Sequence, residues 1–133
     1  MIKNKNKYKN NKITKYNIKF DSIAELQYYE YLLTVYKKDD IIIKPKFILQ
    51  DKFFNEYENK TYSKIIYEAD FQIDNIVIDV KGFPSPVAKL KRKLFINKYP
   101  TLILEWIILA PKKYGGDFIR YDELNAIRKS IKK

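Results

Sequence analysis

The chain has 133 residues, of which 46% are hydrophobic, and its 27 Lys and Arg outnumber 16 Asp and Glu to give a formal net charge of +11. It contains no cysteine and no histidine, which excludes disulfide frameworks, zinc–thiolate sites and catalysis by a histidine base. Any chemistry must use carboxylates, lysines, tyrosines or a metal held by oxygen ligands.

The excess of positive charge favours a polyanionic partner, and nucleic acid is the commonest one. Codon bias in an AT-rich genome is the alternative source of a chain so rich in Lys, Asn, Ile and Tyr. No run of about eighteen apolar residues is present, so no membrane span is expected. The first twelve residues lack the apolar segment of a secretory signal, and we expect a cytoplasmic protein.

Residues 1–15 are mostly Lys and Asn and predict a flexible basic arm, followed by a single domain over 16–133. The first helix is predicted over 22–38. Ser22 is a good N-cap for it, and apolar or aromatic residues recur at helical spacing at Ile23, Leu26, Tyr29, Leu33 and Tyr36.

The rest of the chain predicts alternating strands and helices. In chain order these are a short extended segment at 16–20 before the first helix, a strand at 46–50, a turn or loose hairpin at 51–60, strands at 62–73 and 76–81, a helix at 86–98, a strand at 101–110 and a helix at 121–133. Ser85 followed by Pro86 is typical of a helix start. The order predicts an α/β fold with a mixed central sheet flanked by helices, α-β-β-β-α-β-α.

Asp74-Asn75 suits a two-residue hairpin turn, which would set Ile73 opposite Ile76 and Asp70 opposite Asp79. Because side chains alternate along a strand, the hairpin then has two different faces. The predicted core face carries Tyr67, Ala69, Phe71, Ile73, Ile76, Ile78 and Val80. The predicted polar face carries Glu68, Asp70, Gln72, Val77, Asp79 and Lys81.

Two directly opposed carboxylates repel each other by about 3 kcal/mol at a separation of about 5 Å and an effective dielectric constant of about 20. A shared proton or a divalent cation would offset this repulsion. The alternative interpretation is a solvated sheet face on which Asp70 and Asp79 meet without a function.

The order Asp70, then Asp79-Val80-Lys81, gives the pattern Asp, spacer, (D/E)-x-K. This pattern resembles the PD-(D/E)XK nuclease superfamily, and most closely its small phage nucleases similar to Holliday junction resolvases. The resembling stretches are KFDSIAELQYYEYL, KPKFILQ, YEADFQI, IDVKG and KLKRKLFINKYP. The chain departs from the family pattern at Ala69, where Pro is usual, and at Ile78, where many members carry a second acid.

The resemblance implies a restriction-endonuclease-like core, with a four-stranded mixed sheet, and hydrolysis of phosphodiester bonds that depends on Mg²⁺ or Mn²⁺. It implies that Asp70 and Asp79 bind the metal together with the backbone carbonyl of Val80. It also implies that Lys81 contacts the attacking water and the scissile phosphate. Glu25 on the first helix would complete the site as an outer metal ligand.

Glu25 has a second interpretation, because Ser22-x-x-Glu25 is a capping box in which the Glu side chain accepts from the Ser22 backbone N–H. Glu68 is a further possible ligand, and pairing with Lys81 would account for it equally well.

The helix over 86–98 directly follows the predicted catalytic strand and is strongly basic. Its apolar residues Val87, Leu90 and Leu94 lie on one stripe. We expect its basic residues to contact the DNA backbone; they are Lys89, Lys91, Arg92 and Lys93. The predicted substrate is double-stranded or branched DNA such as a Holliday junction, cut by a homodimer. The alternatives are a nicking or flap endonuclease of phage replication or recombination, and a non-catalytic basic DNA-binding protein.

Overall fold

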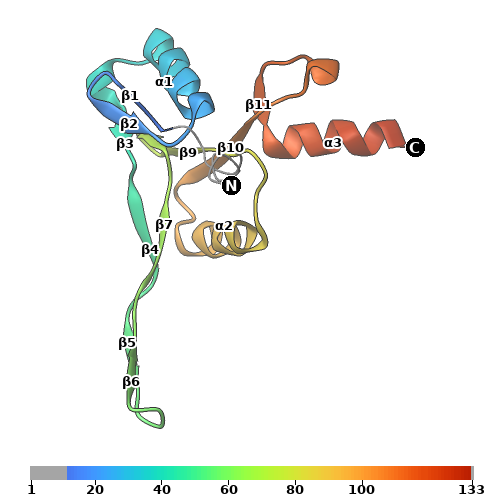
Figure 1. Cartoon of the computed structure of the whole chain (residues 1–133). Helices are drawn as coiled ribbons and strands as arrows, with labels where there is room; N and C mark the ends of the chain where they lie inside the picture. The colour runs from blue at the N-terminus through green and yellow to red at the C-terminus, as the bar shows by residue number, and fades with distance from the viewer. Residues whose placement is uncertain (1–11, 133) are drawn as a thin grey trace, which may run out of the picture. The chain divides into compact units, whose positions relative to one another are not determined.

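The computed structural model describes residues 12–132, and the chain divides into two compact units, Met1–Asp39 and Asp40–Lys133 (Figure 1). The sequence predicts one domain over 16–133, and the division between the two units falls within this range, near Asp39. Of the arm predicted over 1–15, residues 1–11 lie outside the described residues. Residues Ile13–Lys15 of this arm form strand β1.

In the first unit, β1 pairs antiparallel with β2 (Ile18–Phe20). The intervening Tyr16 and Asn17 have φ angles of 57° and 64°, which two-residue hairpin turns require. Helix α1 (Ile23–Val35) starts after Ser22 as predicted but ends three residues before the expected position 38. Its buried side chains are those of Glu25, Tyr28, Tyr29 and Leu32. Of the predicted apolar stripe only Tyr29 is fully buried, where its ring lies 5.4 Å from that of Phe20.

A five-stranded mixed sheet forms the centre of the second unit, with strand order β11-β10-β9-β8-β3. Only β9 and β10 run parallel, and the other neighbours are antiparallel. The strands are β3 (Ile42–Ile43), β8 (Phe71–Ile73), β9 (Ile76–Val80), β10 (Ile103–Leu109) and β11 (Phe118–Arg120). The protein is therefore a mixed α/β structure, as the sequence predicts.

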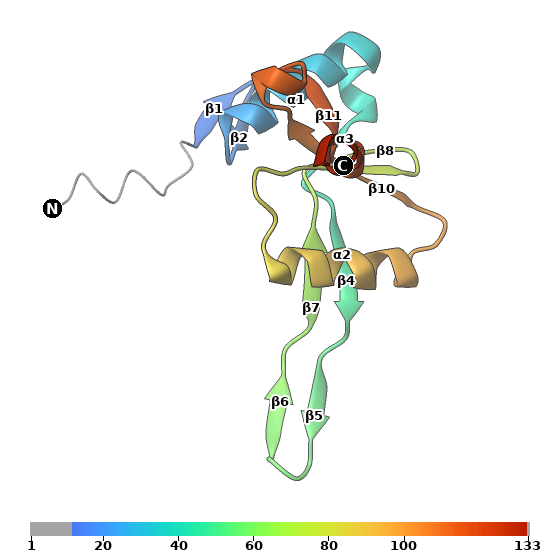
Figure 2. The same ribbon diagram turned by 90° about the vertical axis from the view of Figure 1, so that its right-hand side faces the viewer.

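A long two-stranded ribbon extends away from this sheet (Figures 1 and 2). It is built from two successive antiparallel pairs, β4 (Lys46–Gln50) with β7 (Ile65–Glu68), and β5 (Phe53–Asn55) with β6 (Lys60–Tyr62). The prediction of a strand at 46–50 is confirmed, and the expected loose hairpin is the β5–β6 pair. The single strand predicted over 62–73 is wrong, because β6, β7 and β8 share this segment and pair with different partners.

Helix α2 (Pro86–Lys98) has the predicted bounds, and Ser85 Oγ caps it by accepting from the Ala88 N–H at 3.1 Å. The helix connects the parallel strands β9 and β10, as parallel neighbours require. It packs on β4 and β7 through Phe95, which is fully buried. The apolar stripe of the sequence is not the buried side of this helix, because Val87 and Leu90 are 62% and 57% exposed.

The remaining helical elements complete the chain. They are the 3₁₀ turns η2 (Lys38–Asp40) and η3 (Lys112–Tyr114) and the helix α3 (Tyr121–Lys132), which matches the prediction over 121–133. Helix α3 packs on β10 and β11 and buries Leu124 completely. One core of the second unit consists of Leu49, Tyr67, Ala69, Val77 and Phe95.

Candidate functional site

The β8–β9 hairpin has the register that the sequence predicts. Ile73 pairs with Ile76, and Phe71 pairs with Ile78. Asp74 in the turn has a φ of 52°, a left-handed conformation that Asp tolerates better than most residues. This part of the site could be predicted because a two-residue turn leaves only one register for the strands that it joins.

The regular pairing of β8 with β9 includes Phe71 but not Asp70, the residue before it. The Ala69 N–H donates to the Pro45 carbonyl and the Asp70 N–H donates to the Ile78 carbonyl, each at 3.0 Å. Asp70 is therefore not directly opposite Asp79, and the expected cross-strand pair of carboxylates is wrong. Instead Asp70 Oδ2 accepts from the Val80 N–H at 2.7 Å, which holds the Asp70 carboxylate at the end of β9.

This break also moves Tyr67 and Ala69 to the other side of the hairpin. Strict alternation places both on the core face with Ile78, whereas the structure packs them with Val77. The predicted polar face is not solvated, since Val77 is fully buried and Asp79 is only 5% exposed. Strand β9 has neighbours on both edges and is covered on both faces, which the alternating pattern of a half-exposed hairpin does not indicate.

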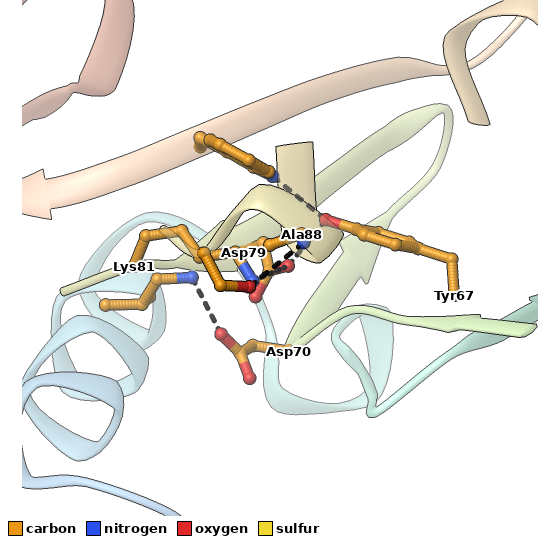
Figure 3. A network of polar contacts seen from close by, with 8 residues as sticks. Tyr67, Asp70, Asp79, Lys81 and Ala88 are labelled. Atoms are coloured by element: carbon orange, nitrogen blue, oxygen red, sulfur yellow. Dashed lines mark hydrogen bonds and ion pairs between the residues drawn. The ribbon is translucent and has the colours of Figure 1, made fainter. Parts of the chain in front are cut away.

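The buried carboxylate of Asp79 has two close partners. The Tyr67 hydroxyl donates to Asp79 Oδ2 at 2.5 Å, and Lys81 Nζ lies 3.1 Å from the same oxygen. The Trp106 Nε1–H in turn donates to the Tyr67 oxygen at 2.9 Å. Figure 3 shows Tyr67, Asp70, Asp79 and Lys81 gathered at one place. A carboxylate so deeply buried requires such partners, because its desolvation is otherwise costly.

Burial raises the pKa of Tyr67, and the negative charge of Asp79 raises that pKa further. Tyr67 therefore keeps its proton through the ordinary pH range and acts as a permanent donor to Asp79. Alternation along the strand places Tyr67 on the opposite face, and no pattern in the sequence indicates a role for Trp106. Both omissions follow from contacts between separate strands, for which the local sequence offers no signal.

Lys81 follows β9 directly, and its N–H donates to the Ile107 carbonyl at 2.7 Å. Its side chain is 22% exposed, and its Nζ lies 5.3 Å from the centre of the Trp106 ring. Lys81 borders an open pocket of about 420 Å³. Tyr67 and Glu68 of β7 and Lys91 of α2 also line this pocket. The pocket gives a ligand access to the ammonium group that pairs with Asp79.

The four basic residues predicted to contact DNA do not form one surface on α2. Lys91 borders the pocket at Lys81, whereas Lys89, Arg92 and Lys93 line a second pocket of about 360 Å³. Arg92 is engaged by another residue of the chain. It forms a bidentate ion pair with Asp122 of α3, in which Nη2 donates to Oδ2 at 2.5 Å and Nη1 donates to Oδ1 at 3.2 Å. The Arg92 Cζ lies 4.6 Å from the centre of the Trp106 ring. Arg92 therefore joins α2 to α3.

Glu25 lies in the first unit, on α1, and is 6% exposed. Its Oε2 accepts from the Asp21 N–H at 2.6 Å, while Ser22 Oγ accepts from the Glu25 N–H at 3.1 Å. Ser22 therefore caps α1 as predicted, but the Glu25 carboxylate accepts from Asp21 and not from Ser22, so the expected return bond of the capping box is wrong. The role of Glu25 as a metal ligand stays a prediction. Glu68 forms its ion pair with Lys46, at 3.7 Å, and not with Lys81 as expected.

The donor set at the end of β9 suits a hard divalent cation. Asp70 and Asp79 supply carboxylate oxygens, and the absence of Cys and His from the sequence removes the softer ligands. Among residues 12–132, no group of three or more acidic side chains converges on one point. Mg²⁺ is commonly bound through only one or two carboxylates, with water and substrate phosphates completing its shell, so two carboxylates fit it.

A family model described as a protein of unknown function, DUF1064, matches residues 5–116. The chain belongs to the DUF1064 family. The match covers all the predicted site residues from Glu25 to Arg92 and Lys93, as well as Tyr67 and Trp106, whereas α3 lies beyond it. No curated protein and no solved structure matches this DUF1064 chain. In the part of it that the structure describes, no helix has the length and apolar character to cross a membrane.

Proposed function

We propose that this DUF1064 protein is a metal-dependent DNA endonuclease with a restriction-endonuclease-like core. The observation that carries the proposal is the meeting of Asp70, Asp79 and Lys81 at the end of β9, beside a pocket lined by Lys91. Two carboxylates and a lysine at an accessible strand end form a suitable site for hydrolysis of a phosphodiester. The net charge of +11 supports a polyanionic substrate.

In this proposal Asp70 and Asp79 hold Mg²⁺ or Mn²⁺, and the carbonyl of Val80 is a further candidate ligand. A bound divalent cation would lower the pKa of a water molecule and polarise the phosphoryl group. The ammonium group of Lys81 lies beside Asp79, and Lys81 lines the pocket. There it can contact a scissile phosphate and stabilise the developing negative charge. Lys91 extends the positive surface along the adjacent backbone phosphates.

The proposed substrate is branched DNA, such as a four-way junction, because the sequence resembles small phage nucleases similar to Holliday junction resolvases. Equal cuts on opposing strands would need two active sites, which a homodimer supplies. A nicking or flap-cutting enzyme would use the same residues and would differ only in the substrate that it cuts.

A non-catalytic basic DNA-binding protein is the second candidate. It is favoured by one observation, the ion pair of Lys81 with Asp79, which compensates the Asp79 charge without a metal. DNA binding of this second kind would not depend on Mg²⁺. Asp70→Ala would tighten it by removing a negative charge near the phosphates.

The test is cleavage of labelled four-way junction, flap and linear duplex DNA with Mg²⁺, Mn²⁺ or EDTA. The variants are Lys81→Ala and, as a matched control, Lys113→Ala. Both lysines lie over an aromatic ring, at 5.3 and 5.2 Å, and both substitutions remove one positive charge. Metal-dependent cleavage that is lost in Lys81→Ala and kept in Lys113→Ala supports the nuclease.

Paired cuts on the junction alone would identify a resolvase, and cuts on the flap or single-strand cuts in the linear duplex would identify the alternative enzymes. An absence of cleavage on all three substrates with either metal, together with tight binding in EDTA, would overturn the nuclease. The basic DNA-binding protein would then be the better description.

A further inference from the structure

Asp79 is connected through Tyr67 to Trp106, a residue on the neighbouring strand. The Trp106 Nε1–H donates to the Tyr67 oxygen at 2.9 Å, and the Tyr67 O–H donates to Asp79 Oδ2 at 2.5 Å. A phenol has one proton, so the bond accepted from Trp106 directs that proton towards Asp79. The three groups are contributed by β7, β9 and β10, so they meet only in the folded unit.

The side chains of Tyr67 and Trp106 are also buried and closely packed. Tyr67 is 3% exposed and packs in the core with Phe95, whose ring centre is 5.3 Å from its own. Trp106 is 2% exposed and is bounded by Arg92, at 4.6 Å, and by the Tyr121 ring, at 5.4 Å. A hydroxyl held in this way can select one orientation of the carboxylate that it contacts.

We propose that Tyr67, oriented by Trp106, is a positioning residue that holds the Asp79 carboxylate for binding a divalent cation. The inference rests on the proposed nuclease function and adds two residues outside the Asp, spacer, (D/E)-x-K pattern. Tyr67 does not itself bind metal in this proposal, because its oxygen accepts from Trp106 and its O–H donates to Asp79. Partners of this kind typically change metal affinity about 10-fold to 100-fold when they are removed.

Tyr67→Phe removes the hydroxyl and keeps the buried ring, so it tests the bond rather than the packing. The matched control is Tyr99→Phe. Tyr99 packs against the same Phe95, at 5.2 Å, and its hydroxyl donates to the Ile48 carbonyl at 2.7 Å, a contact that includes no site residue. Both variants lose one hydroxyl that donates a hydrogen bond, and only the first touches Asp79.

The measurement is the affinity of the full chain for Mn²⁺ without DNA. The electron paramagnetic resonance signal of the free ion reports how much Mn²⁺ is bound. Emission of Trp106 is a second readout at the site, since the sequence contains one tryptophan. We expect Tyr67→Phe to weaken Mn²⁺ binding about 10-fold or more and Tyr99→Phe to leave it unchanged. In the Asp79→Asn background, Tyr67→Phe should have no further effect, because the hydroxyl acts through that carboxylate.

The positioning role is overturned if Tyr67→Phe binds Mn²⁺ as tightly as wild type while Asp79→Asn binds it weakly. That result would leave the proposed nuclease function intact. A wild type that binds no Mn²⁺, or that binds it as tightly as Asp79→Asn, overturns the metal site itself and this inference with it. Should Tyr67→Phe fail to fold, Trp106→Phe removes the N–H donor that orients Tyr67, together with part of the buried indole ring. Unchanged affinity in that variant overturns the orienting role of Trp106.

Discussion

The Tyr67 oxygen lies 2.5 Å from Asp79 Oδ2, although regular alternation along the chain places the two side chains on opposite faces of the hairpin. The contact exists because the strand pairing changes between Tyr67 and Phe71. Residues up to Glu68 pair with β4, and residues from Phe71 pair with β9. Asp70 occupies the change of partner, where its carboxylate reaches the Val80 N–H. The break therefore creates the site.

Removing either carboxylate should abolish the proposed activity without unfolding the protein. We expect Asp70→Asn and Asp79→Asn each to reduce metal-dependent cleavage by about 10²-fold or more, because each removes a charge that holds the cation. The asparagine keeps an oxygen that can accept from Val80 or Tyr67. Cleavage rates at saturating Mg²⁺, beside urea unfolding curves, would measure this. Near wild-type rates in both variants would show that these carboxylates are structural only.

The orientation of α2 gives a stability prediction. Phe95 is fully buried and Leu90 is 57% exposed, although Leu90 belongs to the apolar stripe of the helix. Phe95→Ala should lower the free energy of unfolding by about 3–5 kcal/mol. Leu90→Ala should change it by less than about 1 kcal/mol. Urea denaturation of the two variants tests the rotation of the helix, and a larger loss in Leu90→Ala than in Phe95→Ala would contradict it.

The ion pair between Arg92 and Asp122 predicts a pH-dependent contribution to stability. The hydrogen bond from Arg92 lowers the pKa of Asp122 below its ordinary value. A carboxyl with a depressed folded-state pKa stabilises the fold above the unfolded value of about 3.9, and this stabilisation is lost as the pH falls through the lower folded-state value. Because the Asp122 side chain is 68% exposed, the contribution should stay below about 1 kcal/mol.

Thermal unfolding of Asp122→Asn beside wild type measures this contribution. The variant should be less stable at neutral pH and should match wild type at a pH well below the ordinary aspartate value. Asp51→Asn, which alters an exposed carboxylate outside the Arg92 contact, provides the control. A stability difference in Asp122→Asn that persists unchanged in acid would show that the charge of Asp122 is not its cause.

Local signals predicted the elements whose cause lies within a few residues. Ser85 and Pro86 indicate the start of α2 because an N-cap oxygen and a proline with fixed φ both suit the first helical turn. Asp74 and Asn75 indicate the register of β8 and β9 because a two-residue turn leaves little freedom. These two features alone bring Asp79 and Lys81 to the end of one strand.

The rest of the site depends on which strands meet, and periodicity does not carry this information. Nothing in the alternation over 62–73 shows that β7 joins β4, so the shift of Tyr67 towards Asp79 could not be predicted. The continuous apolar run that forms β10 indicates burial but not that Trp106 would donate to Tyr67. Similarly, four basic residues in one helix do not reveal that Arg92 is engaged by Asp122.

Two substitutions at position 25 would show whether Glu25 acts as a helix-capping residue or as a metal ligand. Its Oε2 accepts from the Asp21 N–H at 2.6 Å, and an amide oxygen can accept the same bond. Glu25→Gln should therefore keep both stability and metal-dependent cleavage near wild type. Glu25→Ala should lower the free energy of unfolding by about 1 kcal/mol, since it leaves a partly buried N–H without this acceptor. Cleavage by Glu25→Gln that falls about tenfold or more, at unchanged stability, would instead assign Glu25 to the metal site, because only the loss of its charge separates the two side chains.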